Sequence, residues 1–191
     1  VDRQILGSYR LFPVHYLAYR LWDEQDPEIK VPSAAELFSR EEIGRTLIPA
    51  MLSRATDSDE LPLSGYTPRN LFRREAIGSH RFRPDIRYAE DLLFIVACMK
   101  DANRAVAVDR AYYHYRFHSG SVTKHFSFHV PESYEKSNDA LEALLADSPE
   151  CMRRMKIRRR KMAVGTVRNF CYPGTPYAFW ERVRRAKAYM N

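Results

Sequence analysis

The sequence predicts a mixed α/β fold, with short strands in its first part and helices toward its end. Residues 12–22 are rich in Tyr, Leu and Val, a composition typical of strands. Residues 92–99 are apolar without interruption, which predicts a buried helix. Pro131 suits the first turn of a helix and precedes a series of Leu residues at helical spacing. These features predict an α/β fold with a helix-rich C-terminal end.

The chain has 191 residues, enough for one domain with a substantial core. Hydrophobic residues make up 45% and charged residues 29%, an ordinary composition for a globular protein. The longest apolar run, residues 92–99, is far shorter than the roughly 18 residues of a membrane span. The start at Val1 has neither an initiator Met nor the apolar segment of a signal peptide, so we expect a processed or truncated piece.

The first strand is expected to end at the polar residues 23–27, and residues 28–32 are expected to form a short partner strand. Two capping-box patterns then predict two consecutive helix starts: Ser33 with Glu36, and Ser39 with Glu42. The second helix is expected to end at about Arg54.

The middle of the chain alternates between short elements. Residues 69–75 are expected to form a short strand that enters a helical turn. A buried helix is expected to begin at Glu90–Asp91 and to continue to about Lys100. Residues 105–108 and 111–116 are interpreted as extended segments, and residues 117–130 as a loop.

Two further helices are expected after the one that begins near Pro131. The first spans about residues 149–170, and a short one follows the break at 172–176. From Cys151 onward the chain has twelve Lys or Arg and one acidic residue, a net charge of +11. Since the whole chain carries +7, residues 1–150 carry −4. We therefore expect residues 1–130 to form one unit and residues 131–191 a helical extension that is basic from residue 151.

The cysteines are Cys98, Cys151 and Cys171, an odd number without metal-ligand spacing. They favour three free thiols and the cytosol over an oxidising compartment.

The most specific stretch lies between residues 69 and 123. It contains, in this order, Leu71-Phe72-Arg73-Arg74-Glu75, Arg81-Phe82, Glu90-Asp91-Leu92-Leu93-Phe94, Tyr112-Tyr113-His114-Tyr115-Arg116 and His118-Ser119-Gly120-Ser121-Val122-Thr123. In order and spacing these segments resemble family-2 glycosyltransferases of the GT-A fold, of the type found in bacterial polysaccharide biosynthesis.

The resemblance implies that the chain is the C-terminal, acceptor-side portion of a GT-A domain. It implies an inverting enzyme that moves a sugar from a nucleotide-sugar donor to a saccharide or lipid-linked acceptor. Such a transfer needs a carboxylate to take the proton of the attacking hydroxyl. The motif puts this base on Asp91, with Glu90 beside it, and the amide dipoles at a helix start favour a negative charge there.

The resemblance also suggests substrate-binding residues near the diphosphate or the acceptor: Asn70, Tyr115, Arg116, His118 and Ser121. Asn70 stands where relatives usually carry Lys, a departure that bears on the substrate class. His118 is also a candidate metal ligand. The family uses a divalent metal, Mg or Mn, and its ligands are expected mostly outside this chain. The literal Asp57-Ser58-Asp59 is interpreted as an ordinary polar loop.

The basic end of the chain allows other interpretations. Residues 151–191 combine cations with apolar and aromatic residues, which suits peripheral binding to an anionic membrane, here at the inner face. Nucleic-acid binding also fits the cations, although no recognition motif supports it. A non-catalytic binding module that kept the motifs of an enzyme is the remaining alternative.

Overall fold

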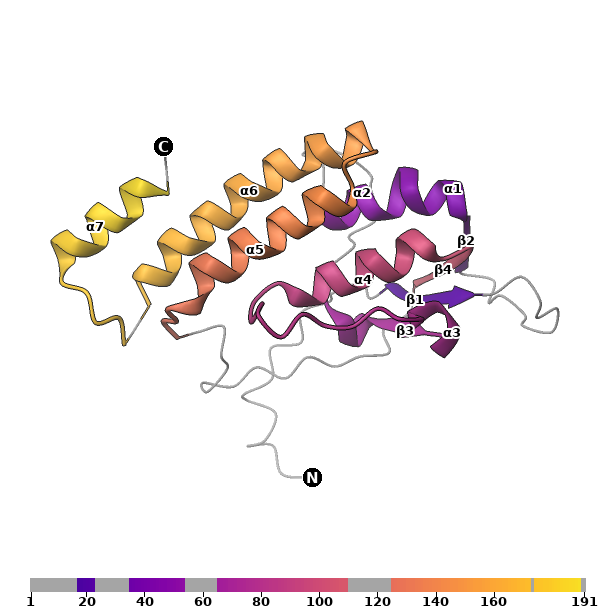
Figure 1. The fold of residues 1–191 in the computed structure, drawn as a ribbon, viewed down its shortest axis with the longest axis horizontal. Helices are drawn as coiled ribbons and strands as arrows, with labels where there is room; N and C mark the ends of the chain where they lie inside the picture. The colour runs from indigo at the N-terminus through magenta and orange to yellow at the C-terminus, as the bar shows by residue number, and fades with distance from the viewer. Residues whose placement is uncertain (1–16, 23–34, 54–64, 110–124, 173, 190–191) are drawn as a thin grey trace, which may run out of the picture.

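The computed structural model describes residues 17–22, 35–53, 65–109, 125–172 and 174–189. The fold is mixed α/β, as predicted. A small sheet lies at one end of the molecule, and two long antiparallel helices extend away from it (Figure 1).

The sheet has the strand order β2-β4-β1-β3. β4 is antiparallel to both of its neighbours, whereas β1 and β3 are parallel. Tyr19 of β1 lies opposite Asn70 of β3 on one side and Ala107 of β4 on the other. The strand bounds are β1 Leu17–Trp22, β2 Ala35–Ser39, β3 Asn70–Phe72 and β4 Arg104–Asp109. The strands predicted at 12–22, 69–75 and 105–108 are therefore present, whereas those predicted at 28–32 and 111–116 lie outside the described residues.

The helix predicted to start at Ser33 is wrong, because residues 35–39 form strand β2. Within this strand Phe38 is buried and Leu37 is exposed, the alternation that a strand covered on one face requires. Leu37 pairs with Val106 and Phe38 with Ala105 of β4. Pairing with a strand some seventy residues later thus overrides a local capping signal.

The second capping box is confirmed, and it joins β2 to the first helix. The Ser39 hydroxyl accepts from the Glu42 amide at 3.4 Å, and the Glu42 carboxylate accepts from the Ser39 amide at 2.8 Å. The helix runs through α1 Arg40–Glu42, the π-helical segment η2 Ile43–Leu47 and α2 Ile48–Leu52. In the wider turn of η2, the amide of Ile48 donates to the carbonyl of Ile43. The residue after Ile48 is Pro49, which has no amide hydrogen to donate.

The middle of the chain forms a 3₁₀ turn, η3 Thr67–Arg69, then β3 and the short helix α3 Arg74–Ile77. The predicted buried helix is α4, Glu90–Asp101. It covers the sheet (Figure 1), and most of its apolar residues are buried: Leu92, Phe94, Ile95, Val96, Cys98 and Met99.

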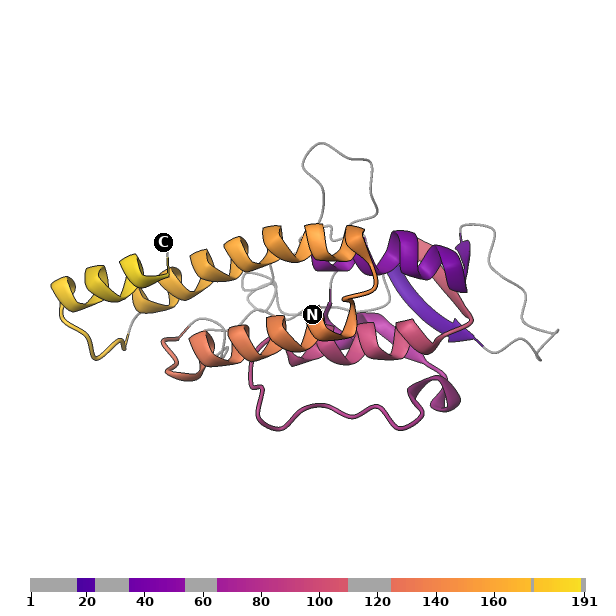
Figure 2. The ribbon, with the colours of Figure 1, turned by 45° about the horizontal axis from the view of Figure 1, so that its top comes forward.

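Three helices complete the fold: α5 His129–Leu144, α6 Pro149–Phe170 and α7 Phe179–Ala188. The loop predicted to reach residue 130 therefore ends slightly earlier, since His129 is already the first residue of α5. α5 packs between α4 and α6, and α6 also contacts α2 and α7 (Figure 2).

One hydrophobic cluster joins these elements. It contains Phe38 of β2, Leu47 of η2 and most of α4, together with Leu141 and Met155 of α5 and α6. Buried residues from both sides of the boundary predicted at residue 130 thus share one core. Among the described helices, none has the length and apolarity needed to cross a membrane.

Candidate functional site

Asp91 lies in the first turn of α4, where Thr67 of η3 holds its carboxylate. The Thr67 hydroxyl donates to Oδ1 of Asp91 at 2.7 Å, and the Thr67 amide donates to Oδ2 at 3.4 Å. Asp91 is half-buried, so the carboxylate is fixed without being sealed from solvent. A carboxylate offers about four acceptor positions, and these two bonds leave others for a substrate hydroxyl.

The backbone just before this carboxylate is strained. Ala89 is the N-cap of α4 and has φ 64°, in the left-handed region that residues with a Cβ rarely adopt. The hydroxyl of Ser137 on α5 donates to the carbonyl of Ala89 at 3.0 Å. A contact from a distant helix thus helps to keep this conformation, and strained backbone of this kind concentrates at functional sites.

Glu90 lies between Ala89 and Asp91 and differs from an ordinary surface glutamate. Burial raises the pKa of Glu90, and the charge of Asp91 adds to the increase, against a backbone hydrogen bond that lowers it. Glu90 therefore holds its proton to a higher pH than a solvated glutamate does. An adjacent pair in different surroundings is the arrangement that lets two carboxyl groups play different roles.

Tyrosine side chains gather around Tyr134 of α5. Burial raises the pKa of Tyr134, Arg158 lowers it, and Tyr172, Tyr66 and Tyr88 raise it further. These electrostatic effects require the groups to be close in space. Tyr66 immediately precedes Thr67, and Tyr88 precedes the strained turn before α4. Tyr66 thus adjoins the residue that binds Asp91, and its side chain combines a flat apolar face with a hydroxyl that can form hydrogen bonds.

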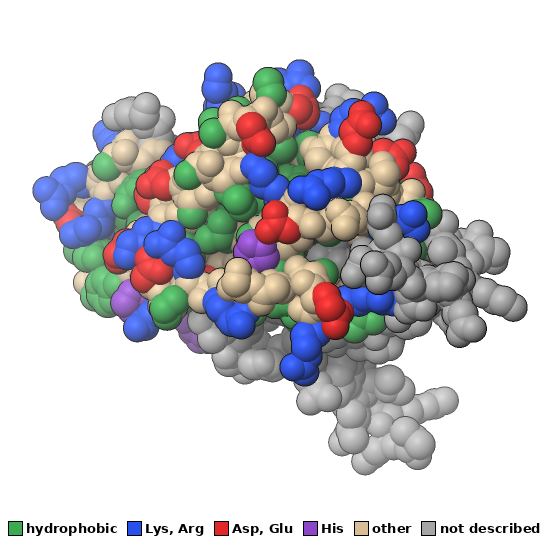
Figure 3. Space-filling model, turned by 45° about the vertical axis from the view of Figure 1, so that its right-hand side comes forward, with side chains coloured by type: hydrophobic (Ala, Val, Ile, Leu, Met, Phe, Trp, Pro, Cys, Tyr) green, Lys and Arg blue, Asp and Glu red, His purple; other side chains and the backbone are tan. Residues whose placement is uncertain are grey.

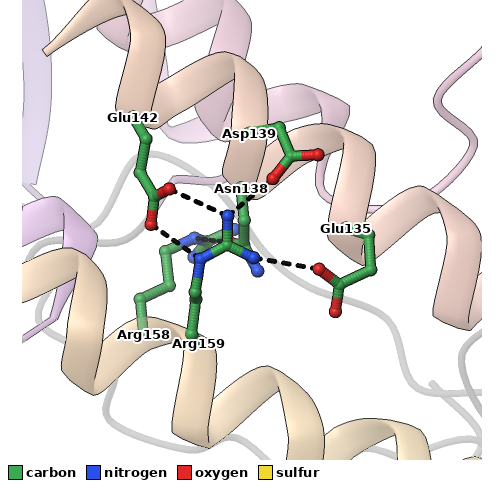
Figure 4. A network of polar contacts seen from close by, with 6 residues as sticks. All are labelled: Glu135, Asn138, Asp139, Glu142, Arg158 and Arg159. Carbon is green, nitrogen blue, oxygen red and sulfur yellow. Dashed lines mark hydrogen bonds and ion pairs between the residues drawn. The ribbon is translucent and has the colours of Figure 1, made fainter. Parts of the chain in front are cut away.

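A buried cation lies beside this group. Arg158 of α6 is only 6% exposed, and its Nε donates to Oδ1 of Asn138 at 3.1 Å (Figure 4). Burial lowers the pKa of Arg158 to about 10. Among the described residues, no carboxylate forms an ion pair with it. Its positive charge is therefore not locally neutralised by this part of the chain.

Asn70 begins β3 and binds the same turn as Asp91. Its Nδ2 donates to the carbonyl of Tyr66 at 2.9 Å, one residue from the Thr67 that binds Asp91. Its Oδ1 is buried and has no hydrogen-bond partner within the described part of the chain. The structure thus brings Asn70 close to the Glu90–Asp91 pair.

The other predicted site residues, Tyr115, Arg116, His118 and Ser121, lie outside the described residues. β4, which precedes them, is nevertheless informative. Its last residue, Asp109, lies opposite Leu17, close to the position where Tyr19 lies opposite Asn70. The C-terminal end of β4 and the N-terminal end of β3 therefore lie at the same end of the sheet.

In the described ranges, no three His, Cys, Asp or Glu side chains gather as a metal site would require. The metal implied by the resemblance thus has no ligand set in this part of the chain.

The three cysteines are free. Cys98 and Cys151 are buried, and burial raises the pKa of Cys98 to about 11, so this thiol is unreactive at neutral pH.

Sequence reasoning missed Thr67, Ala89, Tyr134 and Ser137. Thr67 lies 24 residues from the carboxylate that it binds, and Ser137 lies 48 residues from Ala89. No spacing rule links such positions, because only the packing of η3 and α5 against α4 brings them together.

No protein-family model matches the chain, and neither a curated protein nor a solved structure matches it.

Proposed function

We propose that this chain is the acceptor-side portion of an inverting, family-2 glycosyltransferase of the GT-A fold, with Asp91 as its general base. The observation that carries the proposal is the held but accessible carboxylate of Asp91 at the start of the buried helix α4. The motif resemblance described above assigns the base to the same residue.

In the proposed reaction, a hydroxyl oxygen of the acceptor attacks the anomeric carbon of the donor sugar. A new carbon–oxygen bond forms as the bond to the diphosphate breaks, and the nucleoside diphosphate leaves with the electron pair. The hydroxyl proton moves to a carboxylate oxygen of Asp91. A base must already be aligned with the proton that it removes, and the two bonds from Thr67 supply that alignment.

Neighbouring groups suit the acceptor. Tyr66 is exposed and adjoins Thr67, which binds Asp91, so its ring offers a surface on which a sugar ring can lie. Asn70 binds the carbonyl of Tyr66 and so helps to hold the turn that carries Thr67. The donor, its metal and residues 115–121 would complete the site, and we place the protein on the cytoplasmic side, where nucleotide sugars are available.

The test is an Asp91→Asn substitution in the protein that contains this chain. Transfer from a panel of labelled nucleotide sugars to saccharide and lipid-linked acceptors should fall by about 10²- to 10⁴-fold, the usual contribution of a general base. The amide keeps the size of the side chain and one acceptor oxygen, so it can still accept the shorter of the two hydrogen bonds from Thr67, and the fold should remain. Circular dichroism and thermal unfolding check this point.

A matched control is Asp101→Asn, at the other end of α4. Asp101 is exposed and pairs with His80 at 2.8 Å, away from the proposed site. Its replacement should leave the transfer rate unchanged. Undiminished transfer by the Asp91→Asn protein would rule out its role as base. Sugar binding without transfer by the unsubstituted protein would instead favour a non-catalytic binding module.

A further inference from the structure

The basic residues of α6 fall into two groups with different partners. On the side that faces α5, the Arg159 guanidinium binds three carboxylates at 2.6–2.9 Å (Figure 4), from Glu135, Asp139 and Glu142. These hydrogen bonds, first of all those to Glu142, raise the pKa of Arg159. This cation is thus used to hold α5 and α6 together.

A second face of α6, which begins beside Arg159 and turns away from it along the helix, carries exposed cations. Lys156, Arg160 and Arg168 are all exposed, and among the described residues none of them forms an ion pair with a carboxylate. Together with Val164, which is 67% exposed, they recur every four residues. They therefore form one stripe about 18 Å long on a straight helix. Arg168 also lies over the ring of Tyr172, 5.6 Å from its centroid.

α7 continues this pattern beside the end of α6. One of its sides packs on α6, where Arg182, Val183 and Ala186 line a small cavity with Val167 and Phe170. The other side exposes Trp180, Arg184 and Lys187, spaced as one face of a helix, and of these Arg184 also pairs with Glu181 at 2.7 Å. Trp180 is 78% exposed and Phe179 beside it is 61% exposed. In Figures 1 and 2, α7 lies along the C-terminal end of α6.

We infer that the exposed sides of α6 and α7 bind the surface of an anionic lipid bilayer. A helix that places Trp among Lys and Arg can bury its ring at the level of the lipid headgroups while its cations contact the phosphates. Cations alone would suit any polyanion. The exposed Val164, Phe179 and Trp180 favour a lipid surface, because only a bilayer offers an apolar region beneath its negative charges.

The charges of the chain are distributed unevenly. On the face of the molecule shown in Figure 3, Lys and Arg side chains are interspersed with Asp and Glu side chains. Between Glu150 and Glu181 the sequence contains no acidic residue, so the stripe on α6 has no such neighbours within its own helix. An anionic surface should therefore attract this end of the molecule first.

The test uses the full chain and vesicles of phosphatidylcholine with or without phosphatidylglycerol. The unsubstituted protein should sediment with the anionic vesicles and not with the neutral ones. Replacing Lys156 and Arg160 together with Gln should weaken this binding about 30-fold, from roughly 1 kcal/mol for each cation near the surface. Trp180→Ala should weaken it about tenfold and abolish the blue shift of tryptophan fluorescence on binding.

A matched control replaces Arg45 and Arg74 with Gln. Both are exposed cations on short helical segments at the sheet end of the molecule. This variant carries the same net charge as the α6 variant but should bind like the unsubstituted protein. Equal binding of the two Gln variants would overturn the inference, and so would binding to duplex DNA without binding to anionic vesicles. Because only binding is measured, the result is independent of Asp91 and of the proposed activity.

Discussion

At the residue scale, the segment from Ala89 to Asp91 concentrates two features that are costly by themselves. A residue with a Cβ is left-handed, and the glutamate next to it is partly buried. Neighbouring elements offset part of this cost, because Thr67 binds the Asp91 carboxylate and Ser137 binds the carbonyl of Ala89. Costs of this kind at one place indicate a function beyond folding.

Replacing Glu90 with Gln should raise the free energy of unfolding at neutral pH. At neutral pH the unsubstituted folded protein holds a partly buried negative charge on Glu90, whereas the unfolded chain exposes it to water. Burying this charge costs free energy, and the neutral Gln side chain removes that cost. Because the pKa of Glu90 is raised above its ordinary 4.5, the cost is full above the raised pKa and disappears as the pH falls toward 4.5. The stability difference between the two proteins should shrink in the same window.

Urea unfolding at a series of pH values measures this difference. The exposed Glu75 of α3 provides the control, since Glu75→Gln should change stability little at neutral pH. A stabilisation by Glu90→Gln that persisted unchanged at low pH would contradict an origin in the buried charge.

At the element scale, the junction between β2 and α1 depends on one local motif. Ser39 is at once the last residue of β2 and the N-cap of α1, and Glu42 closes the capping box. The same sequence pattern at Ser33 and Glu36 precedes a strand instead, because β4 offers a pairing edge to residues 35–39. A capping pattern therefore marks a possible helix start, and strand pairing decides whether the start is used.

Ser39→Ala should lower the free energy of unfolding by about 1 kcal/mol, the usual cost of losing an N-cap. The variant leaves the amide of Glu42 without its side-chain acceptor, and the Glu42 carboxylate loses the hydroxyl donor while it keeps the bond from the amide of residue 39. Chemical denaturation followed by circular dichroism measures the loss. Ser79→Ala, in an exposed turn, should change stability by much less, and an equal effect of both substitutions would contradict the role of the cap.

At the scale of the whole molecule, the helical end and the sheet end share one core. Leu141 and Met155 are fully buried and belong to the cluster that contains Phe38 of β2 and most of α4. Arg154 extends the connection, since its Nη1 donates to the carbonyl of Ser53 at 2.7 Å. We therefore expect the described helices and the sheet to unfold together.

Leu141→Ala should destabilise the protein by roughly 2–5 kcal/mol, the range for a leucine truncated in a packed core. Near-ultraviolet circular dichroism reports on the packing of buried aromatic side chains such as Phe94, and far-ultraviolet circular dichroism reports on the helices. The two transitions should coincide before and after the substitution. Val164→Ala, at an exposed position, is the control, and two separate transitions would contradict a common core.

The sequence by itself determined the local features of this protein. Apolar residues 92–99 predicted a buried helix, the residues after 149 predicted a helix to 170, and Ser39 with Glu42 predicted a cap, because each signal lies within a few turns of chain. It also singled out Glu90, Asp91 and Asn70 as candidate site residues.

Only the tertiary structure decided how these features meet. It made residues 35–39 a strand, and it placed Thr67 on Asp91 and Ser137 on Ala89. It also separated the cations of α6 into those that bind α5 and those that face outward. Contacts of this kind join residues far apart in the sequence, and their partners are fixed by the packing of whole helices and strands rather than by local propensity.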